Sequence, residues 1–490
     1  MNSSPLLPDL GQFEGQTDVG LIQRLGICEY DRDRQAYRIS GAGANIWDDQ
    51  DAFHFVWKRM RGNFIVTLRA AFTGPGTHPH RKLGWMARTS LEPDSAHVSA
   101  ALYADGLAAL QFRKAHGSQT EEIRSDMNGA DVIQLERKDR TFRISVAQYG
   151  QPFVDVQVEE INLGPDLYVG LFVCSHQDQV LEQVTFQDVR LVVPVAEGFE
   201  RGRDPFGSKM EILDLASGHR KIVFSAGTIF EAPNWTHDGH DLIFNQDGRL
   251  YRFVLETGEI NPIDTGGIVR NNNDHVLSFD GSRLAISSHG EQDNLARVYT
   301  VPAEGGSPTL ITPGRPSYLH GWSPDGNFLV YTGLRNGDYD IYRIPSAGGT
   351  ETQLTTAIGL DDGPEYTPDG KYIYFNSVRS GSMQIWRMQP DGSRQEQVTD
   401  DEYNNWFPHI SPDGKRVAFV TYLINEAQPG DHPPAKRVYL RVMPVEGGKP
   451  KVIAYLYGGQ GTMNVPSWSP DGKRLAFVSN TVPFNSLIDG

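Results

Sequence analysis

The chain has 490 residues, enough for two or three domains, and its 51 glycines and 30 prolines are typical of a turn-rich, all-β protein. Its 61 acidic and 45 basic side chains give a net charge of −16, which argues against nucleic acid as a partner, because that binding depends on Lys and Arg neutralising phosphates. No stretch of the sequence is long and apolar enough to span a bilayer, so we expect no membrane insertion.

The first residues lack the basic start and the apolar run of a signal peptide. We therefore expect a cytoplasmic protein, or a periplasmic one if a leader has been lost. The two cysteines, Cys28 and Cys174, neither require nor exclude a disulfide, and two free buried thiols are the expected state.

Residues 1–198 contain short runs of alternating apolar character separated by Gly and Pro, which predict a β-sandwich. The expected strands are 63–69, 83–88, 108–113, 142–146, 167–173 and 184–191. Residues 64–71, 84–88 and 168–172 together are similar to concanavalin-like jelly rolls, which occur beside carbohydrate-active domains. This resemblance implies a domain that binds or positions a glycan.

Three tryptophans of this region, Trp47, Trp57 and Trp85, could stack on sugar rings or could belong to the sandwich core. His78 and His80 would share one face of a strand and could hold a metal, although two loop histidines without a third ligand are the simpler interpretation.

Residues 199–490 repeat a Ser/Thr-Pro-Asp-Gly type of turn six times, each followed by a short apolar strand. The turn glycines are Gly239, Gly281, Gly326, Gly370, Gly414 and Gly472. The first five are 42 to 45 residues apart, a period that indicates propeller blades, and Asp-Gly turns of this kind close β-hairpins.

A second turn recurs in the same rhythm and makes two hairpins, or four strands, per blade. Its glycines are Gly218, Gly258, Gly306, Gly349, Gly392 and Gly448. Because Gly218 precedes any turn of the first kind and Gly472 has no second hairpin after it, the two incomplete units should form one blade. We therefore predict a six-bladed ring closed by strands from both ends of this domain.

The pattern Trp322-Ser-Pro-Asp-Gly326, Asp340-Ile-Tyr-Arg-Ile-Pro345, Gly349 and Leu354-Thr355 resembles the TolB-like propeller, often described as a Tol-type biopolymer transporter component. The resemblance extends over residues 204–490. It implies the six-bladed fold, whereas TolB-like propellers occur in periplasmic scaffolds, peptidases and sugar lyases alike.

The Asp-Gly and Gly-Gly turns must lie on one rim of the ring, so functional groups are expected on the other rim, where each blade's first strand begins. Four blades carry proline three positions before the Ser/Thr of the turn, but two carry His275 and His320, and His409 lies one position later in its own blade. The candidate catalytic residues are His275, His320, His409, Asp362, Glu365 and Tyr403. The candidate substrate-binding residues are Asn273, Asp274, Arg335, Asn376, Arg379, Asn405, Trp406 and Asn464.

Two chemistries fit this set. His275, His320 and His409 could hold a divalent metal, Mn, Ca or Zn, that polarises a uronate carboxyl group, and the resemblance to TolB-like oligogalacturonate lyases implies such a site. Alternatively a histidine or Tyr403 could act as base, with Asp362 or Glu365 as acid. Paired carboxylates could also hydrolyse a glycosidic bond.

Arg335 and Arg379 could clamp an acidic group of the substrate. A structural role remains open for each single residue, because Asp and Asn cap turns and a buried His can bond a backbone carbonyl. The insertion 425–434 lies on the same rim, where it could form a wall or lid with His432 as a further ligand, or a solvated loop.

No nucleotide cofactor is expected, since no helix follows the Gly-rich segment 457–464. A Gly-x-Ser-x-Gly elbow is also missing, which excludes a fused serine peptidase. The sequence therefore favours a carbohydrate-active protein, a lyase or hydrolase acting on an oligosaccharide, which the two arginines suggest is acidic. The alternative is a non-catalytic TolB-like scaffold that holds a peptide or an envelope partner.

Overall fold

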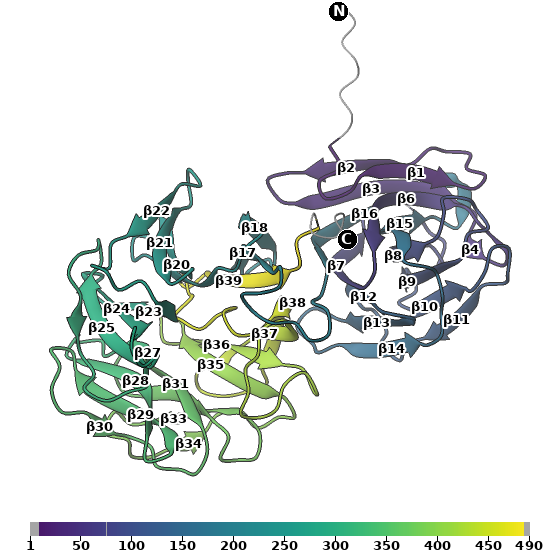
Figure 1. The fold of residues 1–490 in the computed structure, drawn as a ribbon. Coiled ribbons are helices and arrows are strands. Elements are labelled where there is room, and N and C mark those ends of the chain that lie inside the picture. Colours follow the sequence, from purple (N-terminus) through teal and green to yellow (C-terminus); the bar gives the residue numbers. More distant parts are fainter. Residues whose placement is uncertain (1–8, 75, 485–490) are drawn as a thin grey trace, which may run out of the picture. The chain divides into compact units, whose positions relative to one another are not determined.

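The computed structural model describes residues 9–74 and 76–484 (Figure 1), and within these ranges it contains β-strands but no α-helix. The described residues separate into two compact units, 9–194 with 484, and 195–483. The all-β expectation is thus confirmed. Within the described ranges, no helix has the length and apolar character that crossing a membrane would need.

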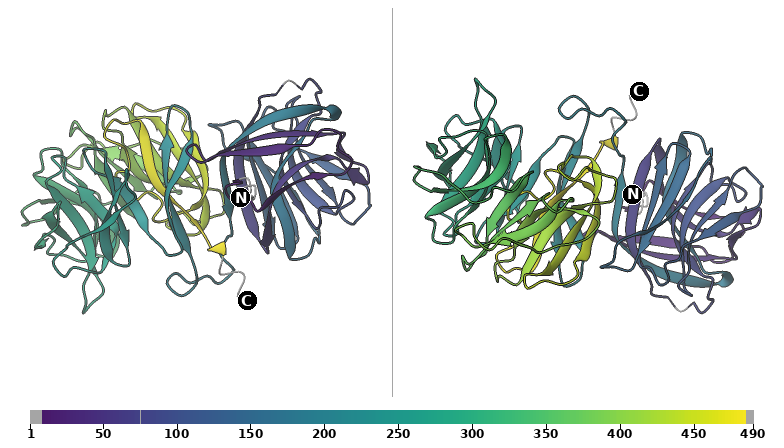
Figure 2. Two further views of the ribbon diagram at one scale, coloured as in Figure 1. Left: turned by 90° about the horizontal axis from the view of Figure 1, so that it is seen from above. Right: turned by 90° about the horizontal axis from the view of Figure 1, so that it is seen from below.

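The first unit consists of two seven-stranded antiparallel sheets, shown in purple and blue from two further sides in Figure 2. One sheet has the order β1 (Gly15–Val19), β6 (Phe53–Arg61), β15 (Asp166–Cys174), β8 (Lys82–Arg88), β9 (His97–Tyr103), β10 (Ala108–Arg113) and β11 (Glu121–Arg124). The other has the order β14 (Val154–Val158), β13 (Thr141–Ala147), β12 (Val132–Lys138), β7 (Phe64–Phe72), β16 (Gln177–Val192), β3 (Ala36–Gly43) and β2 (Ile27–Asp31). The description of this unit as a glycan-binding jelly roll stays a prediction.

A short hairpin of β4 (Ile46–Trp47) and β5 (Gln50–Asp51) is attached to the first unit by a buried charge cluster. The Asp51 carboxylate accepts two hydrogen bonds from the Arg113 guanidinium, at 2.8 and 3.0 Å, and lies 3.5 Å from Arg88. All three side chains are fully buried. Removing one member would leave the opposite charge buried and unpaired, so this cluster fixes the hairpin to β8 and β10.

The aromatic and sulfur side chains of the first unit mostly serve packing. Trp85 is completely buried, so it belongs to the core rather than to a sugar-binding surface. Cys28 and Cys174 are free and buried, as expected.

His78 and His80 lie close to His176, with ring centroids 4.3 and 5.7 Å from that of His176. The Nδ1 of His176 is 2.8 Å from the Ala44 carbonyl. Across the residues that the structure describes, however, no group of three or more His, Cys, Asp or Glu side chains is arranged to hold a metal ion.

The second unit consists of six antiparallel sheets, as the repeat predicts for a six-bladed propeller. The first three sheets are β18 (Arg220–Ala226), β17 (Gly207–Asp214) and β39 (Arg474–Thr481); β19 (Glu231–Trp235), β20 (Asp241–Gln246), β21 (Arg249–Val254) and β22 (Ile260–Ile263); and β23 (Asn271–Leu277), β24 (Arg283–His289), β25 (Ala296–Pro302) and β26 (Thr309–Leu310). The other three are β27 (Ser317–Trp322), β28 (Phe328–Arg335), β29 (Asp338–Pro345) and β30 (Thr352–Gln353); β31 (Asp361–Tyr366), β32 (Ile373–Ser377), β33 (Gln384–Met388) and β34 (Glu396–Gln397); and β35 (Asn404–Ile410), β36 (Arg416–Tyr422), β37 (Lys436–Pro444) and β38 (Lys451–Gly458).

The ring is closed by pairing of the two ends of the second unit, as the two incomplete repeats predict. β39, yellow in Figure 1, lies antiparallel to the teal β17 from Gly207↔Thr481 to Asp214↔Arg474. An isolated bridge between Trp468 and Leu475 adds the start of an inner strand to the same sheet. In this sheet β39 is paired on one side with β17 and bridged on the other at Trp468, and β18 is the edge strand.

The six Asp-Gly turns share one hydrogen-bond pattern, which explains why the repeat keeps its Ser/Thr and Asp. In the blade that begins with β27, the Ser323 hydroxyl donates to Asp325 Oδ1 at 2.5 Å and accepts from the Phe328 backbone N–H at 2.9 Å. The same pair of bonds recurs in the other five turns. Gly326 follows with a φ of 72°, a conformation that favours glycine.

Neighbouring blades are joined by tryptophans that precede these turns. Trp322 Nε1 donates to the Val276 carbonyl of the preceding blade at 2.9 Å, and Trp468 Nε1 donates to the His409 carbonyl at the same distance. The Arg283 guanidinium lies 5.4 Å from the Trp322 ring, a cation–π contact across the same boundary. Packing and hydrogen bonding therefore fix the angle between adjacent sheets.

The hydrogen bonds around Asp325 lower its pKa, chiefly through the Ser323 hydroxyl and the Asn327 backbone N–H. A lowered carboxyl pKa stabilises the fold above the ordinary Asp pKa of about 4, and that contribution is lost as the pH falls through the native value. We expect Asp325→Ala to reduce the free energy of unfolding at pH 7 by about 1 kcal/mol, and the reduction to shrink at acidic pH. Urea unfolding of the full chain at several pH values measures this. Asp338→Ala, at an exposed Asp, is the control; an equal loss in both variants at every pH would contradict the interpretation.

Candidate functional site at the propeller rim

A cavity of about 470 Å³ opens on the rim opposite the Asp-Gly turns. This volume lies within the range of small-molecule sites. The cavity is built from the beginnings of β23, β27, β31 and β35 and from loops between second and third strands. Its lining residues are Asn272, Asn273, Asp274, Tyr318, His320, Thr332, Tyr339, Leu360, Asp362, Phe407, Gly430, His432, Gln460 and Asn464.

Irregular pairing of the first strands brings polar side chains to this cavity. In β27 the register shifts between Leu319 and Gly321, so His320 is the extra residue of a β-bulge. In β31 the register shifts directly after Asp362. Bulges re-aim side chains and are frequent beside active sites. They explain how residues from strands of ordinary appearance converge on one space.

His320 and Asp362 form a buried pair at the cavity wall. His320 Nε2 lies 3.2 Å from Asp362 Oδ1, which also accepts hydrogen bonds from the Thr332 hydroxyl at 2.7 Å and the Gly363 backbone N–H at 2.8 Å. The His320 and Asp362 side chains are 6% and 11% exposed. Three partners thus meet at one carboxylate oxygen that water reaches poorly.

The pair shifts both pKa values in favour of its charged form. Burial alone lowers the pKa of His320, but the bond to Asp362 and the charges of Asp362 and Asp274 outweigh it, so the pKa is raised. Burial likewise raises the pKa of Asp362, and the His320 bond and charge, helped by His432 and Thr332, outweigh it to give a pKa of about 2. Each group of the pair therefore favours the charged form of the other.

Asp274 is a second buried carboxylate in the cavity, with a pKa shifted in the opposite direction. Burial raises this pKa, and the attraction of His320 and the bond from Asn272 only partly oppose the shift. Asn272 Nδ2 donates to Asp274 Oδ2 at 2.5 Å. Two carboxyl groups of one pocket with pKa values pushed apart are a recurrent feature of acid–base sites.

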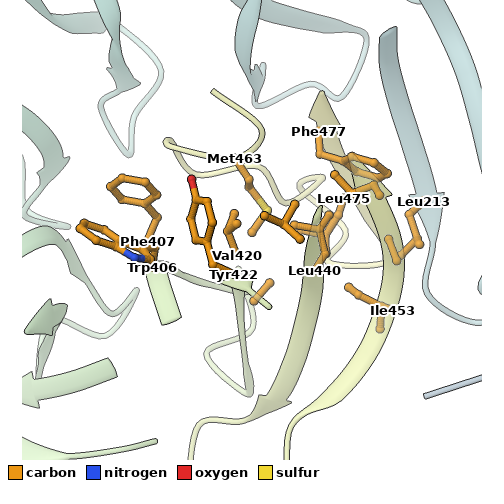
Figure 3. Close-up of a cluster of buried hydrophobic side chains, with 14 of the residues drawn as sticks. Leu213, Trp406, Phe407, Val420, Tyr422, Leu440, Ile453, Met463, Leu475 and Phe477 are labelled. Carbon is orange, nitrogen blue, oxygen red and sulfur yellow. The ribbon is translucent and has the colours of Figure 1, made fainter. Parts of the chain in front are cut away.

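Aromatic rings form one wall of the cavity and connect it to the core. Phe407 lies with its ring centroid 5.9 Å from that of His320, and His432, on the 425–434 insertion, lies 4.5 Å from Trp406 and 5.5 Å from Phe407. Figure 3 shows Trp406 and Phe407 at one end of a buried hydrophobic cluster, with Tyr422 next to them. The φ of Phe407 is 55°, an unusual value for a bulky residue, which the surrounding packing must impose.

The structure brings five of the sequence candidates to the cavity: Asn273, Asp274, His320, Asp362 and Asn464. It also places His432 of the insertion there, 4.0 Å from Asp362 Oδ2. The insertion therefore forms part of the wall.

The expected group of three metal-binding histidines is not found. His275 is fully buried, its Nε2 lies 3.2 Å from the Ile243 carbonyl, and burial lowers its pKa to about 4. His409 Nδ1 lies 2.7 Å from Glu365 Oε2, and its Nε2 lies 3.2 Å from the Met463 carbonyl. Neither ring lines the cavity, and the described residues contain no group of three suitable ligands. The two residues have the structural role that remained open for buried histidines.

The two arginines expected to clamp an acidic substrate are engaged in ion pairs within their own blades. Arg335 donates to both Glu351 oxygens, at 2.8 and 3.0 Å, and Arg379 donates to Asp361 at 2.6 Å. Neither lines the cavity. Their positions therefore give no support to an acidic substrate.

The remaining candidates support the blades rather than line the cavity. The Asn376 side-chain oxygen accepts from the Phe407 backbone N–H at 3.0 Å, and Asn405 accepts from the Thr421 hydroxyl at 2.9 Å. Trp406 is fully buried, Glu365 bonds His409, and Tyr403 packs under the Arg441 guanidinium at 5.0 Å.

Several lining residues were not among the candidates from sequence: Tyr318, Thr332, Tyr339, Leu360, Phe407 and Gln460. Strand alternation could have indicated Tyr318, which lies two positions before His320. Thr332 and Tyr339 come from second and third strands, where the sequence contains no comparable signal.

The fold and site define this part of the chain as a six-bladed β-propeller with a polar cavity on one rim. Residues 316–429 match the family model of the TolB β-propeller domain. An uncharacterized protein of Agrobacterium fabrum is 46% identical over 273 residues, 55% of this chain and 92% of that protein.

A solved structure from Agrobacterium tumefaciens, provisionally described as TolB, is 44% identical, with a TM-score of 0.54 over 56% of this chain and 98% of that one. TolB from Acinetobacter baumannii is 16% identical, with a TM-score of 0.39 over 64% and 79% of the two chains. The chain belongs to the TolB-like β-propeller family.

The pairing of His320 with Asp362 can be tested by titration. We expect Asp362→Asn to lower the pKa of His320 below the ordinary histidine value, because burial then acts without an opposing carboxylate. NMR of the imidazole resonances against pH measures the change. Asp338→Asn, outside the cavity, is the control, and an unchanged His320 pKa in Asp362→Asn would show that the pair does not govern its charge.

Proposed function

We propose that the propeller cavity binds an oligosaccharide, or a ligand of similar polarity, and that His320 and Asp362 support hydrolysis of a glycosidic bond. The observation that carries this proposal is the buried His320–Asp362–Thr332 chain at the wall of a cavity of about 470 Å³. Amide groups of Asn273, Asn464 and Gln460 line the same space and suit sugar hydroxyls.

The charge states favour hydrolysis over elimination. When protonated, His320 can donate the Nε2 proton that it shares with Asp362 to the glycosidic oxygen, and the ionised Asp362 then stabilises positive charge developing on the sugar ring. Water then adds its hydroxyl to the anomeric carbon, and the proton that it releases returns to the neutral His320. The described lining of the cavity contains no Lys or Arg to neutralise the carboxylate of a uronate, since Arg335 and Arg379 lie outside it. No step of this proposal uses a metal.

The second candidate function is binding without cleavage, as in a scaffold that holds a peptide or an envelope partner. Membership of the TolB-like family supports it, since a structure 44% identical to this chain is provisionally described as TolB. The same amide-rich cavity could accept a peptide backbone.

Mass spectrometry of neutral and acidic oligosaccharides after incubation with the protein distinguishes these functions. We expect fragments that together contain one extra water per cleaved bond, and a loss of about 10²-fold or more in rate for His320→Asn. His237→Asn, at an exposed histidine of an Asp-Gly turn, should retain the wild-type rate. Fragments whose masses sum to the substrate would indicate elimination instead, and an untouched panel would favour the binding function.

A further inference from the structure

The acidic and basic side chains that line the cavity are unevenly distributed within it. Its described lining contains two carboxylates, Asp274 and Asp362, and two imidazoles, His320 and His432, but no Lys or Arg. His320 lies 3.2 Å from Asp362, and His432 lies 4.0 Å from the other oxygen of the same carboxylate. The positive groups are thus placed at Asp362, whereas Asp274 has no cation in contact.

Asp274 is buried at 4% exposure, and within the described residues its carboxylate has one hydrogen-bond donor, the Asn272 amide at 2.5 Å. Burial raises the pKa of Asp274, and the coulombic attraction of His320 and His432 opposes this only in part, while the charge of Asp362 adds to it. A buried carboxylate without a cationic partner is costly, and a ligand cation would offset that cost.

Two aromatic rings line the same cavity as Asp274. Tyr318 and Tyr339 both line the cavity, with ring centroids 6.4 Å apart. Tyr318 precedes His320 by two positions on β27, and both side chains line the cavity. Burial raises the pKa of Tyr318 to about 12, so its phenol stays neutral and its ring can attract a cation.

We propose that the cavity selects a sugar that carries a protonated primary amine, an amino sugar, and that Asp274 pairs with the ammonium group. This inference rests on the proposed function, because it specifies the ligand class of the same site. The ammonium supplies the charge and the donors that Asp274 lacks, while the sugar hydroxyls meet the amides of Asn273, Asn464 and Gln460.

Calorimetry of the full chain with three matched trisaccharides tests this inference: β-1,4-linked glucosamine, its N-acetylated form, and the glucose equivalent. We expect the amine form to bind at least ten-fold more tightly than both neutral forms. The preference should weaken as the pH falls toward the raised pKa of Asp274, because the carboxylate must be ionised to pair with the amine.

Asp274→Asn should remove the preference for the amine form, whereas Asp338→Asn should keep it. The comparison of the three sugars with the wild-type protein decides the matter even if Asp274→Asn does not fold. Equal affinity for all three sugars would overturn the amino-sugar inference and leave the proposed function intact. Binding of none of them would overturn both.

Triglycine with a free or an acetylated N-terminus distinguishes a peptide amine from a sugar amine. Binding of free triglycine alone, with no sugar bound, would overturn the amino-sugar inference and favour the scaffold function. Failure of both peptides, together with tight binding of glucosamine trisaccharide, supports it.

Discussion

Pairing of β39 with β17 is the constraint on which the rest of the propeller depends. The two strands lie more than 250 residues apart in the sequence, and their ladder runs from Gly207↔Thr481 to Asp214↔Arg474. Each other blade is a local antiparallel sheet, but only closure of the ring brings the Asn464 segment next to His320, whose pKa reflects bonding to the Asn464 backbone. The cavity is therefore a product of the closed ring and not of any single blade.

The two rims of the ring use the same residue types differently. On one rim, six aspartates accept hydrogen bonds from Ser or Thr within their own turns, so these carboxylates stabilise the turn conformation. On the other rim, Asp362 and Asp274 are held by bulged or irregular strand starts and face a shared space. A turn that repeats six times leaves little freedom to vary, whereas the strand starts differ from blade to blade. This division explains why the chemistry gathers on one rim.

The sequence predicts the blades well because each depends on local signals: an Asp-Gly turn, a second glycine turn and an apolar strand between them. It predicts the rim but not the side-chain directions. His275, His320 and His409 look equivalent in the repeat, but they occupy different positions in the irregular part of their strands. The bulge of β27 includes His320, whereas the register shifts of β23 and β35 end at His275 and His409. Since one residue of register turns a side chain to the opposite face, only His320 reaches the cavity. The partners of Arg335 and Arg379 were hidden for a related reason, because Glu351 and Asp361 become neighbours only through the folding of separate strands.

The electrostatics of the cavity follow from which carboxylate the histidine meets. His320 compensates Asp362 directly, and the Thr332 hydroxyl and Gly363 N–H complete its coordination, so Asp362 is ionised and rigidly held. Asp274 shares the same space but receives only the Asn272 amide. Both imidazoles of the cavity, His320 and His432, lie at Asp362 rather than at Asp274. A ligand that covers Asp274 must therefore supply hydrogen-bond donors to its carboxyl group, and a donor that carries a positive charge would favour the ionised form most.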